Sequence, residues 1–172
     1  KDLKINPSAK ALSPLAPQPK IVGGIAAEQD SWPWMTAFVV TYQATTTSLS
    51  VADVSYDTDS FTFAAAGEAT GEIVDCGLGG SVCADAQAKV CLIQRGEFDF
   101  SEKVNNCEAG GGVGAIIYNN TDGIISGTLG EDFSGTIPVV AITQADGTAL
   151  LEMLGSVATL SVAEGTSLQQ DS

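Results

Sequence analysis

Four cysteines are the residues of this chain whose spacing bears most directly on chemistry. Cys76, Cys83, Cys91 and Cys107 fall within 32 residues, separated by six, seven and fifteen residues. Structural zinc sites usually carry cysteine pairs two to four residues apart, and this sequence has no such pair. The spacing therefore favours two disulfides over a metal site. Because disulfides form in oxidising compartments, we expect a secreted or extracellular protein, with periplasmic transit as one route, and no metal or other cofactor.

The 172 residues include no histidine, which limits the catalytic chemistry that this chain can perform. A Ser-His-Asp triad needs an imidazole to accept the serine proton, and a cysteine nucleophile needs a base as well. A lysine base would need burial to lower its pKa, and Lys103 is the one candidate near an apolar face. We interpret Lys103 as a structural helix residue whose ammonium group reaches a carboxylate. The sequence therefore predicts no catalytic residue.

Two polar sites each have a binding and a structural interpretation. Arg95 follows an apolar strand and precedes a glycine, so its guanidinium could bind a peptide carboxylate. We favour a structural pairing with one of the many carboxylates nearby. The triplet 119–121, Asn-Asn-Thr, fits the acceptor pattern for N-glycosylation, and a turn explains it equally well. Asp57 and Asp59 look like the start of a calcium loop, but the glycine and final glutamate of such a loop are missing.

The charge of the chain excludes whole classes of partner. The chain has seven lysines and arginines and 21 aspartates and glutamates, which gives a formal net charge of −14. Between residues 44 and 165, only Lys89, Arg95 and Lys103 are cationic, against 17 carboxylates. Such a surface repels phosphate backbones, so we expect no nucleic-acid partner. The longest apolar run, residues 35–40, is far shorter than the roughly 20 residues of a membrane span.

A first helix is predicted after residue 99, and it bears on the cysteine pairing. Asp99 and Glu102 form a capping-box pattern, and three glycines at 110–112 end the segment. The apolar residues that share one helical face are Phe100, Val104 and Cys107. On the preceding strand, Cys91 and Ile93 share one face. If these faces meet, the sulfurs approach, which predicts the bridges Cys91–Cys107 and Cys76–Cys83.

The remaining elements indicate an α+β fold. A second capping box joins Thr143 to Asp146 and precedes an apolar stripe of Ala149, Leu150, Met153 and Leu154, closed by Gly155. Residues 43–48 are interpreted as a polar connector. The expected strands are 34–42, 61–67, 72–77, 89–93, 114–120, 137–142 and 156–164. We therefore predict a core of β-strands, forming an open barrel or a sandwich, with two flanking helices.

Residues 20–24, Lys-Ile-Val-Gly-Gly, together with Trp-Pro-Trp-Met at 32–35, form the first familiar pattern. This stretch of about 23 residues resembles the mature N-terminus of trypsin-like serine proteases. In that family, cleavage frees an α-amino group that inserts inward and pairs with an aspartate beside the nucleophilic serine. The resemblance implies an activation cleavage between Lys20 and Ile21.

A second pattern runs from about Ser48 to Gly165, which is two thirds of the chain. The residues that carry it, in order, are Arg95, Gly96, Phe100, Lys103, Gly114, Ala115, Tyr118, Asn119, Asn120, Ile137, Pro138, Val139, Asp146 and Gly147. They resemble the motifs of the protease-associated (PA) domain, a family without chemistry of its own. The family usually has alanine where Cys107 stands, which supports a disulfide role for this cysteine.

The two resemblances together imply a PA domain inserted into a secreted trypsin-like protease. We expect residues 1–20 to be a pro-segment or linker and 21–43 to be the N-terminal strand segment of the protease domain. Residues 44–165 are the expected PA domain, and 166–172 the expected return linker. A surface loop tolerates such an insertion when the ends of the inserted domain lie close together. The catalytic histidine and serine would then lie outside this chain.

These observations lead to one expected function and two alternatives. The expected function is a non-catalytic accessory domain that controls substrate access, contacts proteins or regulates the protease. Its partners would be protein or peptide substrates and the rest of its own protease domain. The alternatives are a stand-alone secreted module that binds peptides or proteins, and a hydrolase that uses paired carboxylates, which no motif places on one pocket wall. Motifs of the form Cys-Gly-Gly and Ala-Ala-His-Cys in the adjoining coding sequence would favour the expected function, an accessory domain of a trypsin-like protease.

Overall fold

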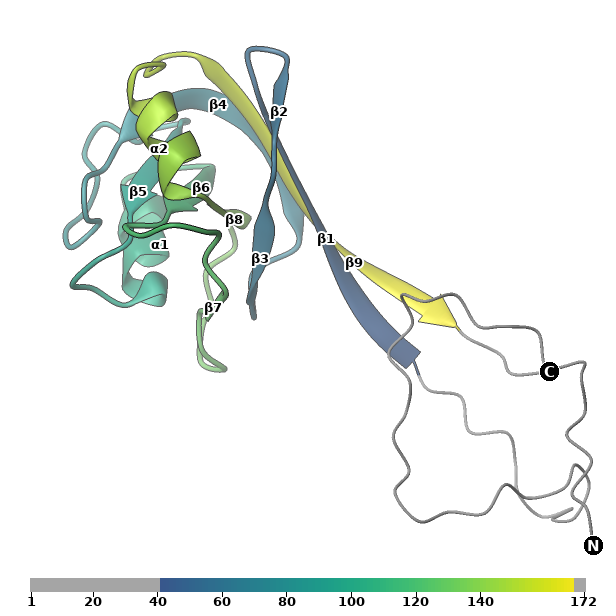
Figure 1. The fold of residues 1–172 in the computed structure, drawn as a ribbon. Helices are drawn as coiled ribbons and strands as arrows, with labels where there is room; N and C mark the ends of the chain where they lie inside the picture. Colours follow the sequence, from purple (N-terminus) through teal and green to yellow (C-terminus); the bar gives the residue numbers. More distant parts are fainter. Residues whose placement is uncertain (1–40, 169–172) are drawn as a thin grey trace, which may run out of the picture. The chain divides into compact units, whose positions relative to one another are not determined.

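Strands dominate the computed structural model, which describes residues 41–168 (Figure 1). In this part of the chain the strands are β1 (Thr41–Val51), β2 (Val54–Tyr56), β3 (Asp59–Thr62), β4 (Gly67–Asp75), β5 (Val90–Gln94), β6 (Gly114–Tyr118), β7 (Gly127–Thr128), β8 (Val139–Ile142) and β9 (Val157–Leu168). The helices are α1 (Phe100–Ala109) and α2 (Gln144–Leu151). All nine strands join one sheet in the order β2-β1-β9-β4-β5-β6-β8-β3-β7. No helix in the described residues is long and apolar enough to cross a membrane.

The centre of the sheet is parallel and is buried on both faces. Strands β5, β6 and β8 run parallel, and α1 provides the crossover from β5 to β6. Their residues alternate between two apolar clusters, one containing Leu150 of α2 and the other containing Val104 of α1. We call these the α2-side core and the α1-side core. The predicted mostly β core with two helices is confirmed, and the continuous apolar runs of these strands are typical of a parallel sheet covered on both faces.

Strand β4 turns the sheet from the parallel centre toward its antiparallel half. Its residues 67–72 pair with β9, whereas residues 73–75 pair with β5. Figure 1 shows β4 as a strongly curved ribbon. Leu49 of β1 and Leu160 of β9 consequently join Leu92 of β5 in the α2-side core. The antiparallel strands thus curl over one face of the parallel centre, which gives the sheet an open, barrel-like half.

The first and last strands form one long antiparallel ladder. Every residue of β1 pairs with β9, from Thr41 opposite Leu168 to Val51 opposite Ala158. The prediction of a polar connector at 43–48 was therefore wrong, because threonine is a good strand former and β9 supplies the partner. The domain boundaries expected at 43/44 and 165/166 both fall inside the ladder. Residues 34–40 of the strand expected at 34–42 lie outside the described residues, and so does the cleavage pair Lys20–Ile21.

Both helices begin where the sequence predicts, but their details differ. Asp99 occupies the N-cap of α1, yet its side chain makes no capping hydrogen bond. At α2 the cap is present, since the backbone N–H of Asp146 donates to the hydroxyl of Thr143 at 3.1 Å. This helix ends at Leu151, earlier than predicted. Its buried residues are Gly147 and Leu150, while Leu154 of the predicted stripe is 46% exposed.

Candidate functional site

A groove of about 740 Å³ lies beyond the carboxyl ends of β5 and β6. It is lined by Arg95, Gly96, Glu97, Phe98, Asp99, Phe100, Ser101, Asn120, Gly127, Thr128, Leu129 and Gly130. Residues 95–101 lead from β5 into α1, and residues 127–130 include β7, the last strand of the sheet. Ligand sites of parallel sheets lie at the carboxyl ends of the strands, where the connecting loops meet. We refer to these residues as the groove.

Arg95 is fixed at the groove by the end of the neighbouring strand. Its backbone N–H donates to Tyr118 O at 2.9 Å, and its Nη1 donates to Asn119 Oδ1 at 3.0 Å. Asn119 is 3% exposed, and its Nδ2 donates to Gly123 O at 2.9 Å, so its amide is held firmly. The expected pairing of Arg95 with a carboxylate was wrong, because the parallel register of β5 and β6 places the amide of Asn119 there instead.

The buried position of Asn119 bears on the glycosylation pattern at residues 119–121. Its side-chain amide is enclosed and occupied by hydrogen bonds, so it cannot serve as a glycan acceptor in the folded chain. Its Oδ1 also accepts from the backbone N–H of Asn120 at 2.9 Å, which is a turn-forming contact. The interpretation of residues 119–121 as a turn is therefore the one that agrees with the structure.

Lys103 is completely buried and supports the loop that connects β4 to β5. Its Nζ donates to the carbonyl oxygen of Leu78 and lies 5.5 Å from the centre of the Phe98 ring. The expected contact of its ammonium with a carboxylate was thus replaced by a backbone carbonyl and an aromatic face. Burial lowers the pKa of Lys103 below its usual 10.5, while Glu102 and Glu97 act in the opposite direction.

Because of this lowered pKa, we expect Lys103 to make stability depend on pH. Between its folded pKa and 10.5 the unfolded chain binds more protons than the folded chain, so the free energy of unfolding rises with pH in that window. Replacing Lys103 by methionine should remove this rise. The measurement is urea unfolding of both proteins from pH 7 to 10.5. The matched control is Lys89→Met, at a partly exposed lysine, and a Lys103→Met protein that keeps the wild-type slope would contradict the expectation.

Both predicted disulfides are present. Cys76 is bonded to Cys83 and Cys91 to Cys107. The second bridge joins β5 to α1 in the α1-side core, where both cysteines are at most 1% exposed. The first bridge closes the loop 77–82, and both of its cysteines are partly exposed. As predicted, β5 and α1 face one another across this bridge.

Most other residues of the second sequence pattern pack against the strands that lead to the groove rather than lining it. Gly147 of α2 packs so closely on Tyr118 that a Cβ there would lie 2.1 Å from its ring. Pro138 is buried, and its carbonyl oxygen accepts from the N–H of Ala115 at 3.0 Å. Phe100 lines the groove itself, with its ring centre 4.9 Å from that of Phe61.

Sequence reasoning missed part of the groove. Its overlooked residues are Glu97, Phe98, Asp99, Ser101, Gly127, Thr128, Leu129 and Gly130. The available signal was the apolar strand 89–93 followed by an arginine and a helix start, which marks a strand end typical of ligand sites. Residues 127–130 carry no such signal, because they reach the groove only through the pairing of β7 with β3.

The groove carries side chains of both charges, one cation and two carboxylates. Arg95 is an exposed cation, and the first turn of α1, with its positive dipole end, begins at Phe100. Glu97 and Asp99 also line the groove, and their carboxylates would repel a ligand with several negative charges. Among the described residues that line the groove there is no lysine, cysteine or histidine. Arg95 is therefore the one side chain among those that line the groove that can donate a charge-assisted hydrogen bond to an anionic group.

Comparison with known proteins identifies related sequences. Residues 36–150 match the family model of the PA domain. Probable leucine aminopeptidase 2 of Aspergillus fumigatus is 34% identical over 114 residues, which is 62% of this chain and 23% of that protein. Aminopeptidase YwaD of Bacillus subtilis is 40% identical over 88 residues, or 48% of this chain and 19% of that protein. The chain thus spans about a fifth of these curated relatives.

Solved structures show the same arrangement. The zinc aminopeptidase BSAP from Bacillus subtilis has a TM-score of 0.65 and 29% identity, covering 77% of this chain and 35% of that one. An aminopeptidase from Aneurinibacillus sp. strain AM-1 has a TM-score of 0.64 and 31% identity, with coverage of 78% and 35%. The subtilisin-like protease Apa1 from an Antarctic Pseudoalteromonas, 20% identical with a TM-score of 0.60, shares the fold. These aminopeptidases give no support to the trypsin-like resemblance of residues 20–35.

Proposed function

Since this chain belongs to the PA-domain family, we propose that it is a non-catalytic accessory domain of a larger secreted peptidase and binds peptide segments in the groove. The observation that carries this proposal is the exposed guanidinium of Arg95, held in place by Asn119 at the groove. The chain contains no histidine to act as a general base, which supports binding rather than hydrolysis. Its two disulfides support an extracellular location.

The ladder of β1 and β9 supports insertion of this domain into a host protein. Thr41 lies opposite Leu168, so the chain enters and leaves the domain at one point. An inserted domain needs such adjacent ends, because they must fit within one loop of the host. We propose residues 44–165 as the main body of the inserted domain, 1–20 as a pro-segment or linker, and 21–43 and 166–172 as the connections to the host, of which 41–43 and 166–168 extend the ladder of β1 and β9.

The host itself has two candidate classes. The related aminopeptidases favour an exopeptidase host, whereas the Lys20–Ile21 sequence favours a trypsin-like endopeptidase. The adjoining coding sequence separates them. Downstream Cys-Gly-Gly and Ala-Ala-His-Cys motifs would establish the trypsin-like host, and metal-ligand motifs of an aminopeptidase would rule it out. A reading frame without any peptidase sequence would favour the stand-alone peptide-binding module.

We expect Arg95 to control peptide affinity. A suitable probe is a set of short peptides that contain leucine and phenylalanine, each with a free C-terminal carboxylate and as its C-terminal amide. The free acids should bind about tenfold more tightly than the amides, because a charge-assisted hydrogen bond to an exposed group contributes about 1.5 kcal/mol. Arg95→Met should abolish this difference, as measured by calorimetry or NMR titration.

The matched control for this experiment is Lys89→Met. It removes the same charge from a residue that does not line the groove. Affinities that fall equally in both variants would show a general charge effect and would refute the assignment of Arg95. Absence of any peptide binding by the wild-type chain would refute the proposed function of the groove.

A further inference from the structure

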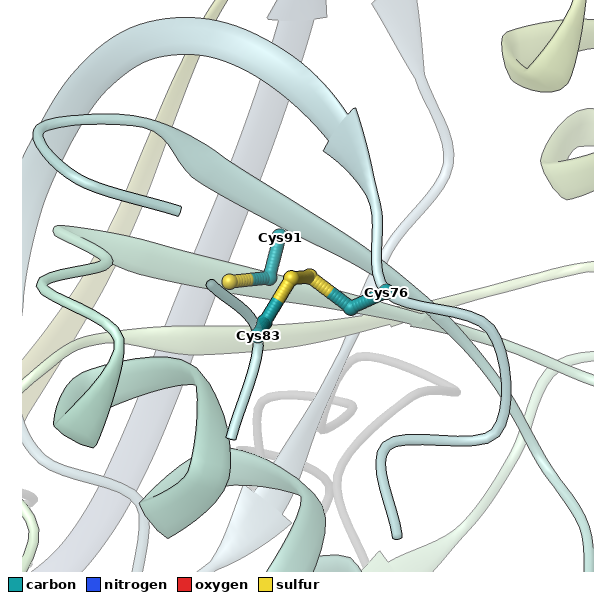
Figure 2. A group of neighbouring side chains, drawn as sticks. All are labelled: Cys76, Cys83 and Cys91. Atoms are coloured by element: carbon teal, nitrogen blue, oxygen red, sulfur yellow. A yellow bond between two sulfur atoms is a disulfide. The ribbon is translucent and has the colours of Figure 1, made fainter. Parts of the chain in front are cut away.

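The two disulfides lie against one another. The sulfur atoms of Cys76, Cys83 and Cys91 all lie within 4.8 Å of one another, although Cys91 is bonded to Cys107. Figure 2 shows the Cys91 sulfur beside the Cys76–Cys83 bridge. Cys91 and Cys107 are at most 1% exposed, whereas Cys76 and Cys83 are partly exposed. We call Cys76–Cys83 the outer bridge and Cys91–Cys107 the inner bridge. The outer bridge is partly exposed to solvent, and the inner bridge is accessible to a thiol from the cysteines of the outer one.

We propose that these four cysteines form a thiol–disulfide exchange site, which a soluble dithiol enters through the outer bridge. Exchange requires a thiolate that can reach a disulfide sulfur. A thiolate at Cys76 or Cys83 would start within 4.8 Å of the Cys91 sulfur. Solvent reaches the inner bridge poorly, so its exchange with an external thiol is slow compared with this internal route.

The reaction balances in two stages. A dithiol gives two electrons to the Cys76–Cys83 bond, becomes a disulfide itself, and leaves thiols at Cys76 and Cys83. One of these, as the thiolate, attacks the Cys91 sulfur and forms a new bond. The Cys91–Cys107 bond breaks, and Cys107 leaves as a thiolate that takes up a proton from water. The product holds one bridge to Cys91, a thiol at Cys107 and a thiol at the unused outer cysteine.

The loop inside the outer bridge also touches the groove. Leu78 O accepts from Lys103 Nζ, and Gly79 O accepts from Asn106 Nδ2 at 2.8 Å. Gly80 packs on Phe98 so tightly that a Cβ would lie 2.2 Å from its ring. Phe98 lines the groove. Opening the outer bridge therefore weakens the packing behind Phe98 on this side of the groove. We expect the redox state of the bridge to change peptide binding, and this expectation rests on the proposed function of the groove.

Single-cysteine variants of the full chain test the exchange without any peptide. In Cys76→Ser the unpaired thiol at Cys83 should attack the inner bridge without added reductant, and in Cys83→Ser the thiol at Cys76 should do so. After alkylation of free thiols and peptide mass mapping, we expect loss of the Cys91–Cys107 bridge and alkylated Cys107 in at least one variant. The yield of alkylated Cys107 within a fixed time should rise from pH 7 to 9, because the thiolate fraction of the attacking cysteine grows.

The double variant Cys76→Ser/Cys83→Ser is the matched control. It lacks the attacking thiol and should retain Cys91–Cys107 in full, which separates exchange from instability of the variants. An intact inner bridge in both single variants at pH 9 would overturn the proposal, and so would loss of that bridge in the double variant. In wild-type chain treated with graded dithiothreitol, the first thiols should include Cys107 together with one outer cysteine. Exchange with unchanged peptide affinity would refute only the effect on the groove.

Discussion

Replacing Cys91 and Cys107 together by alanine is expected to lower the free energy of unfolding by about 3–5 kcal/mol. Closing a loop of about 15 residues accounts for roughly 3 kcal/mol of this in the chain-entropy model. The rest comes from the buried sulfurs, because both cysteines are at most 1% exposed and their removal leaves space between β5 and α1. Urea unfolding followed by circular dichroism measures the change.

The outer bridge supplies the comparison. Cys76→Ala/Cys83→Ala opens a shorter loop and removes partly exposed sulfurs, so we expect a smaller loss of about 2–2.5 kcal/mol. The ranking is the decisive result. Equal losses of stability on removal of the outer and the inner bridge would show that burial of the inner bridge adds nothing to the free energy of unfolding.

Gly147→Ala is expected to lower the free energy of unfolding by about 2 kcal/mol. The added Cβ would lie 2.1 Å from Tyr118 Cγ and 2.2 Å from Tyr118 Cβ, so α2 must move away from β6. A clash this close places the overpacking cost near the upper end of its usual range, at about 3 kcal/mol. The gain of roughly 1 kcal/mol in helix propensity when alanine replaces glycine offsets part of it and leaves the loss of about 2 kcal/mol. Urea unfolding again measures the change.

Gly67→Ala is the matched control for the effect at Gly147. A Cβ on Gly67 would lie 3.8 Å from Pro138, an ordinary contact, so we expect a change within about 0.5 kcal/mol. Gly147→Ala should also weaken peptide binding, because Tyr118 O accepts the backbone N–H of Arg95 at the groove. Stability equal to that of the wild type would contradict the predicted clash.

Local sequence patterns identified the elements whose signals lie within one segment. The strand at 89–93 and the helix after Asp99 could be predicted with their buried faces, and the cysteines on those faces led to the bridge that joins them. The end of α2 could not be predicted. Its stripe continues in sequence to Leu154, but the chain turns away after Leu151 and leaves Leu154 exposed.

The amino-acid sequence by itself determined the apolar strands, the helix starts, the disulfide chemistry and the absence of an imidazole base. It also determined the PA-type pattern of residues that the family match confirmed. Only the tertiary structure decided what Arg95 contacts. A carboxylate was the expected partner in so acidic a chain, but the parallel register sets Gln94 beside Tyr118 and so brings Arg95 to Asn119. Strand register depends on pairing between distant segments and on the faces they bury, and no local pattern encodes it.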